Sequence, residues 1–307
     1  MKKNEIAGIM AATACLAFLG GCLSNRCTTV QDSTGARVAL QQPAARIVST
    51  VPSNTEILYA LGLKDQVVGV TEYCGKTCDT TGKIIVGGWV NPNCEKIRAL
   101  KPDLIFAFGG AQRKRLDQFR AIAPTYCFEP TTVEETFRVI RDIGRLTRRA
   151  PEAKEIIKKQ KEVLVRVQAG LFALPSQDRL RVARVFGTST NVTTAGGRSF
   201  LTDVIKRAGG ENIFGDEDDD YPQVSFERLA ALNPDVLIVH GEKDEVKKKK
   251  VAFRESAAFS KLKAVQNDRV LVYSCADICH PNAAIADTIA MVARGLYPGI
   301  FNKDNHE

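Results

Sequence analysis

One eleven-residue segment occurs twice in this chain and constrains its fold more than any other feature. Residues 95–105 (EKIRALKPDLI) return as residues 227–237 (ERLAALNPDVL), with five identical positions and four conservative replacements. Each copy is typical of a short helix that leads through Pro-Asp into a buried apolar strand. Two copies are too few for a solenoid, which needs at least about three stacked repeats. The repeat therefore predicts two similar lobes, each with one glutamate at the same position, Glu95 and Glu227.

Length and charge narrow the class of protein. The 307 residues suffice for two domains of about 100–150 residues each. A content of 44% hydrophobic and 25% charged residues is typical of a soluble globular chain. The net charge of +8 is spread along the sequence, and the dense lysine run at 247–250 stands beside Glu242, Asp244 and Glu245. A solvated surface explains this pattern better than nucleic-acid binding, so we expect no nucleic-acid partner.

The first 22 residues have the pattern of a bacterial export signal. Lys2 and Lys3 precede an apolar core at 6–18, shorter than the ~20 residues that span a membrane, and Leu-Gly-Gly-Cys follows at 19–22. This ending resembles the lipoprotein cleavage box, although a plain secretory signal that ends in cysteine is the alternative. We predict a signal peptide at 1–21, a lipid on Cys22 and a flexible tether at 22–45. The protein would be exported and anchored to a bacterial membrane, in the periplasm or at the cell surface; which membrane is left open.

Strand and helix patterns alternate from residue 46 onward, which predicts parallel sheets covered by helices. The N-terminal lobe spans 46–131, with a capping box at 53–56, and the C-terminal lobe spans 176–307. The segment between them, 132–175, is helical except for a break at Pro151. A stiff helix between two lobes should permit only a small closing motion. We expect the ligand cleft between the lobes, at the carboxyl ends of the strands.

Several sequence motifs resemble one family. The matching motifs are RIVS at 46–49, PSNTEILYALG at 52–62, VVGV at 67–70, GGW at 87–89, AGGENIF at 208–214 and YPQVS at 221–225. Together they are similar to the iron-siderophore/cobalamin family of ABC-transporter substrate-binding proteins, over residues 46 to about 298. The resemblance implies two Rossmann-like lobes joined by a long rigid helix. It also implies a monomer without a resident cofactor that captures a corrinoid, cobalamin, and delivers it to a permease dimer. Capture of a ferric siderophore or haem by the same fold is the alternative.

The two repeated glutamates match docking positions of that family, in which one glutamate on each lobe enters an arginine pocket of a permease subunit. Glu95 and Glu227 each follow a plausible N-cap residue, Asn93 and Ser225. The helix dipole alone favours an acidic residue in the first turn. It does not explain the same offset in both lobes, which a two-fold symmetric partner would explain. We expect both residues to contact the permease.

The predicted cleft loops carry aromatic side chains, which offer a large flat ligand much contact area at low entropic cost. For Phe108 and Phe186, a role in the core is an equally good interpretation. His280 precedes Pro281 and Asn282, where relatives often have Pro-Arg, so the polar contacts of the ligand stay open. His280 could ligate the metal of a chelate or form a local hydrogen bond. By resemblance, the predicted ligand contacts are Tyr73, Trp89, Phe108, Phe186 and Tyr221; His280, which departs from the family pattern, is a further candidate contact in the last cleft loop.

Four cysteines form two pairs of equal spacing, Cys74 with Cys78 and Cys275 with Cys279, one pair in each lobe. In an exported protein, a local disulfide within each pair is the first interpretation. A four-thiolate metal site is the alternative because the spacing lies in the zinc range, and a thiol-based redox protein is the second functional class. No Ser-His-Asp, paired-acid or phosphate-loop pattern is present, so we expect no enzyme activity.

Overall fold

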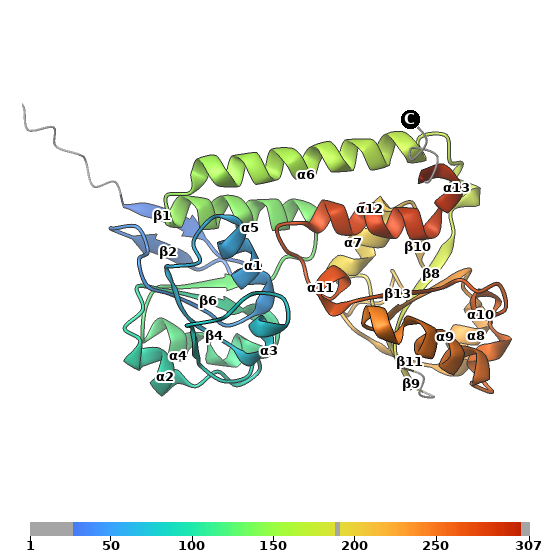
Figure 1. The fold of residues 1–307 in the computed structure, drawn as a ribbon, viewed down its shortest axis with the longest axis horizontal. Helices are drawn as coiled ribbons and strands as arrows, with labels where there is room; N and C mark the ends of the chain where they lie inside the picture. The colour runs from blue at the N-terminus through green and yellow to red at the C-terminus, as the bar shows by residue number, and fades with distance from the viewer. Residues whose placement is uncertain (1–26, 188–190, 302–307) are drawn as a thin grey trace, which may run out of the picture.

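The computed structural model describes residues 27–187 and 191–301 and shows two α/β lobes side by side beneath a long helix (Figure 1). The predicted signal peptide, 1–21, and Cys22 lie outside the described residues. Within the described part of the chain, no helix combines the length and the apolar character needed to cross a membrane.

The N-terminal lobe is built on a five-stranded sheet in the order β5-β4-β3-β6-β7, and every neighbouring pair is parallel. Its central strands are buried apolar runs because helices cover both faces of a parallel sheet. The strands are β3 (Ile47–Ser49), β4 (Val67–Val70), β5 (Ile84–Ile85), β6 (Leu104–Phe108) and β7 (Thr125–Phe128). The helices are α1 (Pro52–Ala60), α2 (Cys94–Ala99), α3 (Gly109–Gln112) and α4 (Leu116–Arg120), with a 3₁₀ turn at Glu72–Lys76.

The predicted capping box at 53–56 is wrong. Helix α1 begins earlier, at Pro52, and its N-cap residue Val51 makes no side-chain cap. Proline is favoured at the first position of a helix, where its missing N–H costs nothing. Glu56 consequently lies in the middle of α1, and its carboxylate can form hydrogen bonds with residues outside this helix.

The C-terminal lobe has a six-stranded mixed sheet in the order β11-β9-β8-β12-β13, with β10 also paired to β8. Its parallel strands are β8 (Arg181–Phe186), β10 (Glu211–Asn212), β12 (Val236–His240) and β13 (Val270–Tyr273). Strand β9 (Asn191–Thr194) runs antiparallel to both of its neighbours, β8 and β11 (Gln223–Ser225). Since only residues 187–190 connect β8 to β9, the chain can return beside β8 only in the antiparallel direction. The expected parallel sheet is thus confirmed at the centre and wrong at this edge.

The helices of the C-terminal lobe follow its strands. They are α7 (Phe200–Arg207), α8 (Phe226–Leu232), α9 (Val246–Glu255), α10 (Lys263–Gln266), α11 (Cys275–Ile278), α12 (Ile285–Leu296) and α13 (Pro298–Phe301).

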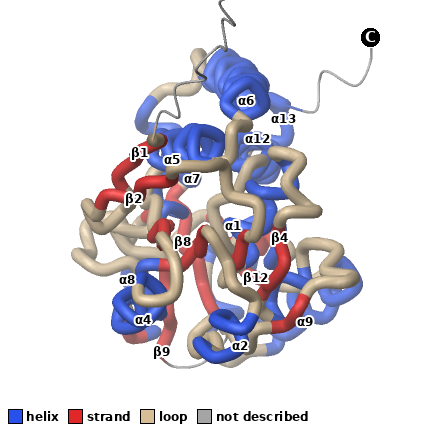
Figure 2. The backbone as a smooth tube through the Cα atoms, turned by 90° about the vertical axis from the view of Figure 1, so that its left-hand side faces the viewer, coloured by secondary structure: helices blue, strands red, loops and turns tan. Residues whose placement is uncertain are grey.

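Two antiparallel helices form the predicted helical segment. Helix α5 (Val133–Leu146) ends at a turn over 147–149, and α6 (Ala150–Leu171) then lies across α5 and α12 (Figures 1 and 2). Pro151 stands in the first turn of α6, where the sequence predicted a break. Gln160 of α6 fastens α12, because its Nε2 donates to Asp287 Oδ2 at 2.7 Å and its Oε1 accepts from the Ala286 amide at 2.7 Å.

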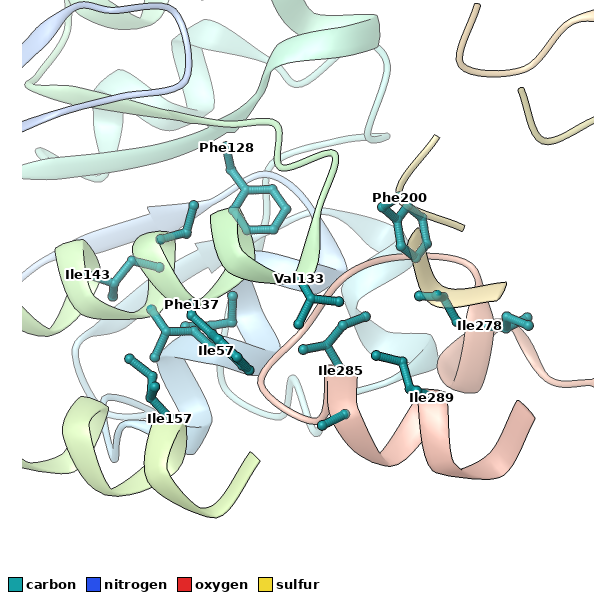
Figure 3. Packing of buried hydrophobic residues seen from close by; sticks show 14 of the residues in the cluster. Ile57, Phe128, Val133, Phe137, Ile143, Ile157, Phe200, Ile278, Ile285 and Ile289 are labelled. Carbon is teal, nitrogen blue, oxygen red and sulfur yellow. The ribbon is translucent and has the colours of Figure 1, made fainter. Parts of the chain in front are cut away.

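The largest hydrophobic core runs through both lobes without interruption. Figure 3 shows side chains of α1 and α5, such as Ile57 and Phe137, in one cluster with Ile285 and Ile289 of α12. Burial of apolar surface stabilises by about 25 cal/mol per Å². Wide separation of the lobes would expose this shared core to water, so the structure favours a small closing motion.

The tether prediction is wrong for residues 28–40. These residues form an antiparallel hairpin of β1 (Thr28–Gln31) and β2 (Arg37–Leu40). Val30, Val38 and Leu40 are buried, and the hairpin packs against α5. Only alternate residues of each strand face the core, so the polar composition of the segment concealed its strands.

Candidate functional site

A cavity of about 560 Å³ lies between the lobes. This volume is within the range of small-molecule sites, about 300–1,000 Å³. All six predicted ligand contacts line it: Tyr73, Trp89 and Phe108 from the N-terminal lobe, and Phe186, Tyr221 and His280 from the C-terminal lobe. The structure therefore brings these residues together, while their contact with a ligand stays a prediction.

Gln112, a residue that the sequence did not single out, holds the aromatic wall of the N-terminal lobe. The Trp89 and Phe108 rings lie 6.1 Å apart at 60°. The fully buried Gln112 side chain donates to the backbone oxygens of Trp89 and Thr50 and accepts from the Phe108 amide at 3.0 Å. It therefore ties the Trp89 loop to the end of β6. A lone glutamine in a helical pattern gave no sequence signal.

The C-terminal lobe contributes its own pair of rings to the cavity. Phe186 and Tyr221 meet edge to face at 5.7 Å and are 36% and 41% exposed. The Arg184 guanidinium lies 4.0 Å from the centre of the Phe186 ring, within the range of a cation–π contact. Phe186 is thus a cavity residue and not a core residue. Phe108 both lines the cavity and packs against the core.

Charged groups also line the cavity, and the sequence interpretation missed them. Glu129 forms an ion pair with Arg113. Burial raises the pKa of Glu129, while Arg113 opposes this shift and Asp220 adds to it. Arg198 lies 3.8 Å from Asp220. The acidic run at 216–220 is the only sequence signal for this group.

The lobes are linked across the cleft through Glu56. Its carboxylate contacts His280 Nε2 at 2.7 Å and accepts from Asn282 Nδ2 at 2.5 Å. Burial alone would lower the pKa of His280, but hydrogen bonds with Cys275 and Glu56 raise it to about 9. His280 is therefore a cationic partner of Glu56 at neutral pH, and its Nε2 is occupied.

Neither predicted disulfide is formed in the structure, because Cys74, Cys78, Cys275 and Cys279 are free thiols. Cys74 is fully buried, and its sulfur accepts from Thr55 Oγ1 at 3.2 Å. Burial raises the pKa of Cys78 to about 11. The four thiols do not converge in the structure, since the group of converging metal-ligating side chains within the described residues contains no thiol of the N-terminal lobe.

The second cysteine pair has a different environment, because Cys275 and Cys279 both line the cavity. A hydrogen bond from Cys279 and another from His280 lower the pKa of Cys275. The same bond to Cys275, together with burial, raises the pKa of Cys279.

The repeated glutamates occupy equivalent positions on α2 and α8. The predicted N-caps are confirmed, since Asn93 Oδ1 accepts from the Lys96 amide at 3.0 Å and Ser225 Oγ accepts from the Arg228 amide at 3.2 Å. Glu95 and Glu227 are both exposed. Both helices lie on the half of the molecule away from α6 (Figures 1 and 2).

Two lobes around a ring-lined cavity, braced by one long helix, define a bilobed solute-binding protein. The model of the periplasmic binding protein family matches residues 47–274, and the chain belongs to this family. Its members are solute-binding components of transporters, and membership implies an exported protein.

The chain is also similar to individual named proteins and solved structures. A vitamin B12-binding protein of Yersinia pseudotuberculosis is 32% identical over 207 residues, which are 67% of this chain and 72% of that protein. The periplasmic vitamin B12-binding protein BtuF of Vibrio cholerae is similar in structure, with a TM-score of 0.71, 25% identity and coverage of 83% and 98% of the two chains. Helicobacter pylori CeuE in a nickel–histidine complex has a TM-score of 0.77 at 18% identity, with 91% of each chain covered, and shares the fold.

Proposed function

We propose that this protein captures a corrinoid, cobalamin, in the cavity between its lobes and delivers it to an ABC importer. The observation that carries this proposal is the set of six aromatic side chains, the five predicted ones and Phe200, that line one cavity from both lobes. Rings on opposite sides suit a large flat ligand that is held by its faces and edges. The 32% identity to a vitamin B12-binding protein supports the choice of ligand.

The delivery step uses Glu95 and Glu227 as paired contacts with the two permease subunits. Both are exposed and begin equivalent helices, so a two-fold symmetric partner can recognise each lobe in the same way. A lipid on Cys22 holds the monomer at the membrane and keeps it close to the permease. The protein binds and releases its cargo without chemical change.

A ferric siderophore or haem is the second candidate ligand, and the charged lining of the cavity favours it. Glu129, Arg198 and Asp220 provide polar contacts that a charged iron chelate can use. A possible iron-binding protein from Staphylococcus epidermidis has a TM-score of 0.70 at 26% identity, with 83% of this chain and all of that chain covered.

Ligand binding by the purified exported form separates these candidates. Isothermal calorimetry with cobalamin should give saturable one-to-one binding, and the recovered complex should have the absorption spectrum of a corrin. No heat at micromolar cobalamin, together with haem or ferric-siderophore binding under the same conditions, would reject cobalamin and support the second candidate.

A further inference from the structure

Three potential metal ligands converge at the wall of the cavity in the C-terminal lobe. His240 ends β12, and Cys275 follows β13, its parallel neighbour, by two positions. Since His240 pairs with Tyr273 in the sheet, the two strands end beside each other, and His240 and Cys275 lie at the same edge of the sheet. Cys279 lies four residues after Cys275, on the same face of the α11 turn.

The separation of the ligand atoms suits one metal ion. The imidazole nitrogen and both sulfurs lie within 4.8 Å of one another. Zinc binds thiolate sulfur at about 2.3 Å and imidazole nitrogen at about 2.0–2.1 Å, which puts tetrahedral ligand atoms roughly 3.3–3.8 Å apart. Small side-chain rotations can close the difference. All three residues are partly buried, so solvent does not fully compete for them.

A buried guanidinium beside the sulfurs is a second, independent feature. Arg184 is fully buried, and within the described residues its Nε and Nη2 pair with no carboxylate. Its Nη1 donates to the Val185 carbonyl at 2.7 Å, while Nε and Nη2 have no nitrogen or oxygen acceptor. The Arg184 side chain interacts with the Cys279 sulfur. A buried cation of this kind needs a nearby anion, and thiolate is the form of cysteine that binds metals.

We propose that His240, Cys275 and Cys279 bind one divalent ion of the zinc class at the wall of the ligand cavity. Two sulfurs and one imidazole nitrogen are the donors that zinc prefers over magnesium or calcium. Because Cys275 and Cys279 line the cavity, the fourth coordination position opens toward it. Three protein ligands with one open position are the pattern of a zinc ion that can also bind an exchangeable molecule.

The geometry also separates this ion from the metal of the cargo. A metal in a planar macrocycle leaves only two axial positions, one on each face, so three side chains that converge from one lobe cannot all bind it. A small free ion can accept all three. The site is therefore additional to the proposed cobalamin function, and neither depends on the other.

The test uses the purified protein after reduction and removal of metal. Co²⁺ serves as an optical probe, since thiolate–Co²⁺ bonds produce an intense near-ultraviolet charge-transfer band. We expect one equivalent of Co²⁺ to produce this band and Zn²⁺ to remove it. Cys275→Ser, Cys279→Ser and His240→Gln should each weaken Zn²⁺ binding by more than the ~10–100-fold that loss of a supporting group costs.

Cys78→Ser is the matched control, because it makes the same change in the other cysteine pair and should leave Zn²⁺ affinity unchanged. Circular dichroism checks that each variant is folded. If His240→Gln is not folded, His240→Ala is used in its place. The proposal is overturned if the Co²⁺ band is absent. It is also overturned if Zn²⁺ affinity is unchanged in either serine variant or in the folded histidine variant, or if the control loses as much Zn²⁺ affinity as they do. The proposal is also overturned if the protein is isolated with a Cys275–Cys279 disulfide and the two thiols released by reduction bind no Zn²⁺. Cobalamin calorimetry without added metal reports separately on the proposed function.

Discussion

The two lobes are alike at their outer helices and different at the cleft. Each lobe presents one exposed glutamate in the first turn of a helix with a side-chain N-cap. At the cavity, the N-terminal lobe contributes rings held by a buried glutamine, whereas the C-terminal lobe contributes rings, two thiols and a histidine. A symmetric partner favours equal contacts on both lobes, and an asymmetric ligand does not. The contrast separates the surface proposed for the transporter from the surface proposed for the cargo.

Charge reversal at the outer helices should have the largest effect. Glu95→Arg or Glu227→Arg should reduce cobalamin uptake by at least about 10-fold, and the double variant should abolish it, because like charges at an interface cost several kcal/mol. Uptake of labelled cobalamin by cells that depend on this protein measures the effect. Calorimetry should show unchanged ligand affinity.

Glu162→Arg is the control for this experiment, since Glu162 is an exposed glutamate on α6, away from the proposed docking surface. Normal uptake with the double variant would refute the docking proposal. An effect confined to one glutamate would show that the outer helices are alike in structure but not in function.

Removal of one ring from each lobe should weaken ligand binding. We expect Trp89→Ala and Phe186→Ala each to raise the cobalamin Kd by about 10–100-fold, the effect of losing an aromatic anchor worth ~1.5–3 kcal/mol. Phe172→Ala is the control, because Phe172 is 92% exposed and does not line the cavity. If calorimetry shows unchanged affinity for both cavity variants, the ligand is not held by these walls.

Loss of the link across the cleft should lower stability moderately. Glu56→Ala removes the acceptor of Asn282 Nδ2 and the partner of His280 Nε2, which costs about 1–3 kcal/mol and should lower Tm by roughly 2–8 °C. Differential scanning calorimetry measures the shift, and Glu72→Ala, an exposed glutamate of the same lobe, should change Tm little. An unchanged Tm for Glu56→Ala would show that the lobes are held by their shared core alone.

The smallest expected effect concerns the buried carboxylate of Asp142 on α5, whose partner Tyr126 belongs to the N-terminal lobe. Asp142 accepts from the Tyr126 hydroxyl at 3.3 Å, and burial raises its pKa. A raised pKa means that ionisation costs stability as pH rises through the folded value. Asp142→Asn keeps an acceptor, so its Tm should exceed that of the parent at pH 7, and the difference should vanish in acid. Equal Tm values at both pH values would contradict this.

Sequence patterns predicted the centre of each sheet and the cavity residues well. The alternation of strand and helix predicted from residue 46 onward is confirmed, for example at β4 and β6, because buried parallel strands are largely apolar runs. The six ligand candidates share one cavity because strand ends and loops of the same edge meet there.

The missed features depend on partners distant in sequence. Glu56 has the local pattern of a capping box, yet its partners lie more than 220 residues away. The two cysteine pairs have the same spacing, and only the fold brings His240 to one of them. Local patterns also concealed the β1–β2 hairpin, since half of its side chains face solvent.

The core that crosses from one lobe to the other affects how a transporter can distinguish loaded from empty receptor. With α6 bracing both lobes, capture of cargo should alter the outline of the molecule very little. A permease that docks on the outer helices would then meet almost the same surface in both states. The permease would then have to distinguish loaded from empty receptor by contact with the cargo at the mouth of the cleft, or by the free energy needed to separate the lobes.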